Sequence, residues 1–101
     1  MQAFYPPAFD REQGCTDAEW RRMLPGAVDG HALAFDADGR GATVTLGGGA
    51  LRLDWTVMPP RAIALIRMPR LAVRYRFDAV DEAVRQAFMK RFDLHIQRGG
   101  G

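Results

Sequence analysis

The clearest hydrophobic pattern in the chain covers residues 71–77, where large apolar side chains occupy every second position. Leu71, Val73, Tyr75 and Phe77 alternate with Ala72, Arg74 and Arg76. Because successive side chains of a β-strand point to opposite faces, this spacing predicts a strand whose odd-numbered side chains enter the core. Arg74 and Arg76 then lie together on the other face.

The same period of two recurs earlier, over residues 28–35, 42–46 and 51–57. Asp36-Ala37-Asp38-Gly39 separates the first two of these segments, and Gly47-Gly48-Gly49 separates the next two. Both are turn sequences, so consecutive strands are predicted to form hairpins. We expect Pro59-Pro60 to end the third strand and the apolar run at 62–66 to form a separate short strand.

Two segments show helical signals instead. Thr16-Asp17-Ala18-Glu19 is a capping box, which predicts a helix start, and Pro25-Gly26 predicts its end. A second helix is expected after residue 78, with Asp78 or Asp81 as its N-cap. The predicted apolar stripe of this helix comprises Val80, Val84, Ala87, Phe88 and Phe92, and leaves Arg85, Lys90 and Arg91 mostly outside it. Leu94 and Ile96 are expected to form a last short strand.

These elements predict an α+β fold, in which an antiparallel meander of about five strands packs one face against the C-terminal helix. A short helix is expected near the N-terminus. A curled sheet or partial barrel is an alternative form of the same predicted architecture. Residues 4–9, rich in aromatic residues and proline, are expected to form an extended arm packed on the domain. Residues 1–98 form a single domain, and residues 99–101 form a flexible glycine tail.

Composition indicates the cellular compartment in which the protein is expected. The single cysteine, Cys15, excludes an internal disulfide framework and fits a reducing compartment. The first nine residues lack the basic and apolar regions of a signal peptide, and no aliphatic run approaches the length needed to cross a bilayer. We therefore expect a cytoplasmic, soluble protein with no membrane partner. Lys90 is the only lysine among 14 basic residues, and coding bias in a GC-rich bacterial genome explains that preference for arginine.

Several motifs resemble chemical sites only in part. Asp36-x-Asp38-Gly39 opens like a calcium loop, but the expected glutamate is absent, and a hairpin turn is the better interpretation. The glycines at 47–49 precede neither a lysine nor a helix, which disfavours a phosphate cradle. His31, His95 and Cys15 are too few for a metal site, and no histidine near Cys15 marks a nucleophilic pair. We predict no catalytic residue, no metal and no cofactor. Acidic groups such as Asp54 and Glu82 are assigned to solvation and capping.

Arginine is concentrated in residues 57–77, which contain five guanidinium groups and no carboxylate. By strand parity, Arg52, Arg74 and Arg76 share one sheet face with Thr43, Thr45 and Thr56. Such a face suits a phosphate or carboxylate group. The alternative is an ordinary solvated face, on which Asp54 and Asp78 pair with these arginines. Aromatic side chains fall on the inner parity, so nucleic-acid binding is disfavoured.

Three function classes follow. The leading hypothesis is a non-catalytic binding or protein-interaction module, a homodimer that uses the exposed sheet face or an edge strand. The alternative is an anion-binding module that holds a phosphorylated ligand or nucleic acid through Arg52, Arg74 and Arg76. The third is a small enzyme, for which the sequence offers no residue set.

Overall fold

A five-stranded antiparallel sheet organises the chain, as seen in a computed structural model that describes residues 4–98. The strands are β1 (Ala8–Gln13), β2 (Leu33–Phe35), β3 (Gly41–Leu46), β4 (Gly49–Ile63) and β5 (Ile66–Asp78). The helices are α1 (Asp17–Ala27) and α2 (Glu82–Arg98). The predicted α+β class is confirmed, and the sheet is open and not closed into a barrel. The predicted glycine tail lies outside the described residues.

The strand order is β1-β5-β4-β3-β2. The four strands from β2 to β5 form the predicted meander, and β1 pairs antiparallel with the free edge of β5. This first strand was expected only as an extended arm over residues 4–9, because its sequence shows no strong alternation. Its partner residues lie more than 50 positions away, so pairing with β5 is a tertiary effect.

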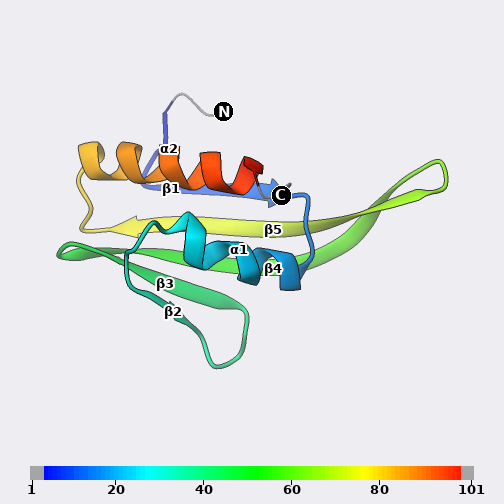
Figure 1. The fold of residues 1–101 in the computed structure, drawn as a ribbon, viewed down its shortest axis with the longest axis horizontal. Coiled ribbons are helices and arrows are strands. Elements are labelled where there is room, and N and C mark those ends of the chain that lie inside the picture. Colours follow the sequence, from blue (N-terminus) through cyan, green and yellow to red (C-terminus); the bar gives the residue numbers. More distant parts are fainter. Residues whose placement is uncertain (1–3, 99–101) are drawn as a thin grey trace.

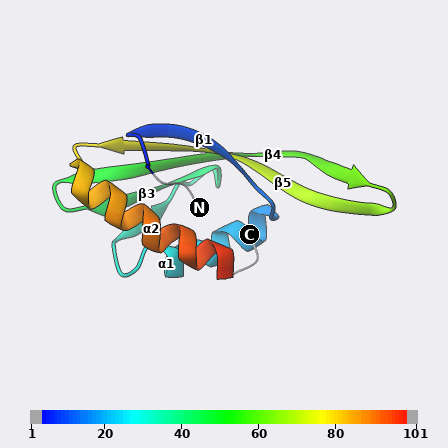
Figure 2. The same ribbon diagram turned by 90° about the horizontal axis from the view of Figure 1, so that it is seen from above.

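Both helices cover the same face of the sheet, as Figure 2 shows. The buried side chains on that face come from odd positions of β4 and β5, including Leu53, Trp55 and Tyr75. On the helix side, Trp20 of α1 packs edge-on against Trp55 and against Phe92 of α2. The fold is therefore two layers, with the core between sheet and helices and the opposite sheet face open.

The alternation predicted for residues 71–77 is confirmed. Leu71, Val73 and Tyr75 are buried and Phe77 is half-buried, whereas Arg74 and Arg76 are exposed. The capping box at Thr16 and Glu19 is also present, because each residue's side chain accepts a hydrogen bond from the other's backbone N–H. These features depend on residues close in sequence.

The prediction of a separate strand at residues 62–66 is wrong. β4 continues through Pro59-Pro60 to Ile63, and a two-residue turn at Ala64-Leu65 leads directly into β5. The strand tolerates the prolines because the register shifts by a bulge between Met58 and Arg61. β4 and β5 therefore form one long hairpin whose outer part extends beyond the rest of the molecule (Figure 1).

The helix ends also differ from the predictions. Pro25 and Gly26 lie within α1, which continues to Ala27. The strand expected at Leu94 and Ile96 is absent, because α2 continues to Arg98 and buries Ile96. The buried side of α2 is rotated from the predicted stripe. Val84 and Ala87 are exposed, and Arg85 is buried, where its Nε donates to the Tyr5 carbonyl oxygen over 2.8 Å.

A buried polar network fastens β1 and the N-terminal segment to α2. Arg11 Nη1 and Nη2 donate to Asp93 Oδ1 and Oδ2 over 2.7 and 2.8 Å, and the Tyr5 hydroxyl donates to Asp93 Oδ2 over 2.6 Å. The Arg11 guanidinium also lies over the rings of Phe9 and Tyr75. A bidentate, charge-assisted pair of this kind stabilises the fold only while both partners are present.

Replacing Asp93 should therefore destabilise the fold strongly. In Asp93→Ala the Arg11 guanidinium loses its counter-ion inside the protein, and we expect the free energy of unfolding to fall by about 3 kcal/mol or more. Urea denaturation measures this. The matched control is Arg91→Ala, which breaks an ion pair to Asp29 of the same 2.7 Å length whose side chains are both exposed. That change should cost less than about 1 kcal/mol, and equal losses would contradict the role of burial.

Alkaline pH should weaken the same network through Tyr5. Burial and the hydrogen bond to Asp93 raise the pKa of Tyr5 from 10.0 to about 12. The folded protein thus keeps this proton to higher pH than the unfolded chain does. The stability contribution is complete below pH 10 and is lost as the pH rises through about 12. Unfolding free energies across this window should fall less steeply for Tyr5→Phe than for the unchanged protein, and identical slopes would contradict the assignment.

Candidate functional site

The sheet face opposite the helices is the first candidate surface, and we call it the open face. The even-numbered side chains of β4 from 50 to 56 and of β5 from 72 to 78 lie on it, with Thr43 and Thr45 of β3 and Asp10 and Glu12 of β1. The prediction that Arg52, Arg74 and Arg76 share a face is confirmed by the register. Arg52 lies directly opposite Arg76, and Arg74 lies opposite Asp54.

Arg52 is held by two carboxylates. Its Nη1 donates to Asp36 Oδ1 over 2.7 Å, and its Nη2 donates to Asp54 Oδ1 over 2.6 Å. These hydrogen bonds raise the pKa of Arg52 above its already high usual value, and they lower the pKa of Asp36. The predicted hairpin turn between β2 and β3 is present and contains Asp36. The carboxylate of Asp36 binds Arg52. Arg52 is thereby directed toward β2 and away from β5.

The two arginines of β5 differ from Arg52. Arg74 Nε donates to Asp10 Oδ1 of β1 over 3.3 Å, with both side chains largely exposed. Arg76 makes no ion pair within residues 4–98. The three guanidinium groups thus share a face, but Asp36 beside one edge strand and Asp10 on the other edge strand draw Arg52 and Arg74 apart. An exposed pair such as Arg74 with Asp10 contributes little energy and opens readily to a competing anion.

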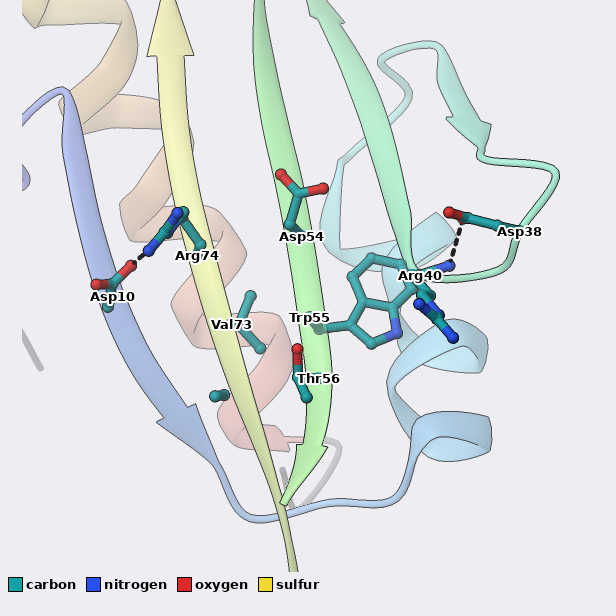
Figure 3. A pocket seen from close by; sticks show the side chains of 9 residues that line it. Asp10, Asp38, Arg40, Asp54, Trp55, Thr56, Val73 and Arg74 are labelled. Atoms are coloured by element: carbon teal, nitrogen blue, oxygen red, sulfur yellow. Dashed lines mark hydrogen bonds and ion pairs between the residues drawn. The ribbon is translucent and has the colours of Figure 1, made fainter.

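A hollow of about 570 Å³ lies on the open face beside Arg74 (Figure 3). Asp10 and Arg74 line one side, and Asp38 and Arg40 line the other, with Asp54, Trp55 and Thr56 between them. Trp55 contributes little apolar surface to the hollow, because its side chain is nearly buried. Its Nε1 donates to Asp17 Oδ1 over 2.7 Å. Arg40 uses its backbone N–H to bind Asp38, and its guanidinium makes no ion pair within the described residues.

The cysteine and both histidines lie away from this hollow. Cys15 is buried, and burial together with Glu19 raises the pKa of its thiol to about 11, so the thiol stays protonated. His31 packs against the ring of Phe88, and His95 lies on α2 beside Gly26. Within residues 4–98, no three His, Cys, Asp or Glu side chains are placed to share a metal ion. Neither helix there combines the length and apolar character that crossing a bilayer requires.

The outer part of the β4–β5 hairpin is the second candidate surface, and we call residues 58–70 the arm. It extends past both helices and past β1, β2 and β3, as both ribbon views show (Figures 1 and 2). Four large apolar side chains on it are exposed: Ile63 at 54%, Leu65 at 100%, Ile66 at 64% and Met68 at 46%. The core contains no residue of the arm, so the body of the protein leaves these side chains uncovered.

Two of the arm's arginines share one carboxylate of β1, which offsets one of their two positive charges. Arg61 Nη2 and Arg70 Nη1 donate to Glu12 Oε1 and Oε2, each over 3.2 Å. Arg67 makes no ion pair among residues 4–98. Sequence analysis singled out this stretch for its arginines, whereas its apolar side chains were assigned to a separate short strand. Because Pro59-Pro60 predicts the end of a strand, the full length of the hairpin was not predicted.

Comparisons with family models, with curated proteins and with solved structures find no match for this chain. The arm and the open face are thus the features from which its function is inferred.

Proposed function

We propose that this protein is a non-catalytic interaction module whose arm binds another macromolecule. The observation that carries the proposal is the exposure of Ile63, Leu65, Ile66 and Met68 on a hairpin that extends beyond the core. Contiguous apolar surface of this kind marks interaction sites in proteins, whereas single exposed apolar residues do not.

The backbone at the tip of the arm supports this proposal. Ala64 adopts a positive φ of 54° in the two-residue turn, a conformation that glycine or asparagine usually supplies. An alanine there gives the turn no solvating polar group, and the next residue, Leu65, is fully exposed. A turn with only a structural role would be expected to carry polar residues.

The edges of the sheet are poorer contact surfaces than the arm. β2 is an edge strand of only three residues. β1, the other edge, carries Asp10, Arg11 and Glu12 in succession, and charged residues discourage pairing with another strand. The arm itself contains Pro59, Pro60 and Pro69, which supply no backbone donors. Contact through side chains of the arm is therefore favoured over the edge pairing considered from sequence.

Site-specific photo-crosslinking in the native host tests the proposal. A photoreactive phenylalanine analogue at Leu65 should give covalent adducts with another chain, because that side chain is fully exposed at the tip. The matched control places the same analogue at Gly48, in the turn between β3 and β4, where an added side chain meets open space. Adducts at both positions, or at neither, would contradict an arm-specific interaction.

Anion binding by the open face is a second proposal. Its support is that Arg76 and Arg40 make no ion pair within residues 4–98, while the pair of Arg74 with Asp10 is exposed. Arg40 and Arg74 lie at opposite sides of the hollow (Figure 3), so a phosphate-bearing small molecule is the ligand class that would fit. Arg52, held by Asp36 and Asp54, would then contribute charge nearby without contacting the ligand.

Calorimetric titration with inorganic phosphate and a nucleoside monophosphate tests this second proposal. Affinity at low salt should fall at least tenfold in Arg40→Ala/Arg74→Ala and should fall further as salt is added, because each lost guanidinium at the hollow removes a charge-assisted contact. Arg91→Ala, an exposed arginine on α2, serves as the control and should leave affinity unchanged. Absence of binding at low salt would remove this function.

A further inference from the structure

We infer that the partner of the arm is a second copy of this chain, and that two arms pack face to face about a two-fold axis. The inference rests on the proposed interaction function and names the occupant of that surface. Three observations carry it: the apolar face of the arm, the lack of a comparable apolar partner elsewhere in residues 4–98, and the exposed apolar area.

The strand register places the apolar side chains on one face of the arm. Ile63 pairs with Ile66, and Arg61 pairs with Met68. Directly opposed residues of an antiparallel pair point to the same side, so these four share a face. Ala62, Arg67 and Pro69 occupy the other side. Arg61 and Arg70 both reach Glu12 on the open face, which shows that the apolar face of the arm continues the open face.

The two arginines on this face share one carboxylate of their own chain, which lowers the positive charge of the face by one. Glu12 already binds Arg61 and Arg70, and Arg67 lies on the opposite side. Surfaces that bind nucleic acid or anionic lipid rely on clusters of basic residues without internal counter-ions. Two copies can approach through Ile63, Ile66 and Met68 while Arg61 and Arg70 stay bound to Glu12 of their own chain.

No other part of residues 4–98 offers the arm a comparable apolar partner. The remaining exposed large apolar residues are scattered: Phe4 precedes β1, Phe35 lies on β2, Val57 lies at the base of the arm, and Val84 and Leu94 are ten positions apart on α2. The surface that best matches the arm is the arm itself. A two-fold contact uses the same patch on both chains, and an antiparallel crossing sets the tip of each arm against Met58 and Met68 of the other. Methionine adapts its shape to such contacts.

The available area fits a modest dimer. The exposed fractions of Ile63, Leu65, Ile66 and Met68 correspond to roughly 500 Å² per chain, so complete burial in two chains would cover about 1,000 Å², the lower limit of a specific interface. Interfaces at this limit are typical of complexes that form and dissociate, so dimerisation should depend on protein concentration.

Sedimentation velocity over a series from low to high micromolar concentration tests the inference. The mass should rise from 11.2 kDa toward twice that value. Ile63→Ser/Ile66→Ser should raise the dissociation constant at least tenfold. Val84→Ser/Leu94→Ser removes two apolar residues of similar exposure from α2 and should dimerise like the unchanged protein. Circular dichroism of both variants checks that the body is folded. A monomer at every concentration, or a dimer unaffected by the arm variant, would overturn the inference.

Disulfide trapping supplies a second measurement that does not depend on affinity. Ile63→Cys/Met68→Cys in one chain should give a covalent dimer under mild oxidation, because the antiparallel crossing sets Ile63, at the tip of each arm, against Met68 of the other. Val84→Cys should not. The natural Cys15 is buried and does not compete. Absence of trapping in the arm variant would contradict the face-to-face arrangement.

The identity of the partner separates failure of this inference from failure of the interaction function. Crosslinks from Leu65 to a different protein would overturn the second copy and keep the interaction module. Arm-dependent flotation of the protein with phosphatidylserine vesicles, or an arm-dependent shift of double-stranded DNA, would likewise replace the second copy as occupant. Crosslinks from Leu65 to the same chain, with concentration-dependent dimerisation, support both.

Discussion

The antiparallel pairing of β4 with β5 is the constraint on which the other features of this protein depend. It is the longest pairing in the sheet, running from Ala50 opposite Asp78 to Ile63 opposite Ile66. Because side chains alternate along each strand, this one register assigns Leu53 and Tyr75 to the core and Arg52 and Arg76 to the open face. A shift of one residue would exchange the two sets. Beyond the body, the same pairing forms the arm without help from any helix.

A second interaction holds the layers together. The sheet and α2 are joined at their edge by Asp93, which accepts from Arg11 on β1 and from Tyr5 ahead of it. Arg85 and Gln86 of α2 bind the Tyr5 carbonyl oxygen as well. These hydrogen bonds hold the strand that carries Glu12, whose carboxylate binds the arm's arginines. The N-terminal segment and the arm are connected through this single strand.

The distribution of charge separates the two candidate surfaces. On the open face, arginines and carboxylates are nearly balanced and mostly paired, so an anion must compete with Asp10, Asp36 and Asp54 for them. On the arm, no group among residues 4–98 covers the apolar side chains. Exposed ion pairs are weak and contribute little to either outcome, whereas exposed apolar area has a consistent preference for burial. This difference is why the arm is favoured as the contact surface.

The sequence by itself determined the features that depend on neighbouring residues: the alternation over residues 71–77, the capping box at Thr16, the turn at Asp36, and hence an α+β fold with an antiparallel sheet. It also placed Arg52, Arg74 and Arg76 on one face, because parity follows from strand geometry alone. Only the tertiary structure decided that Arg11 pairs with Asp93, that Arg85 is buried and that β4 passes through two prolines. Each of these depends on a partner distant in sequence or on a bulge, and local periodicity carries no information about either.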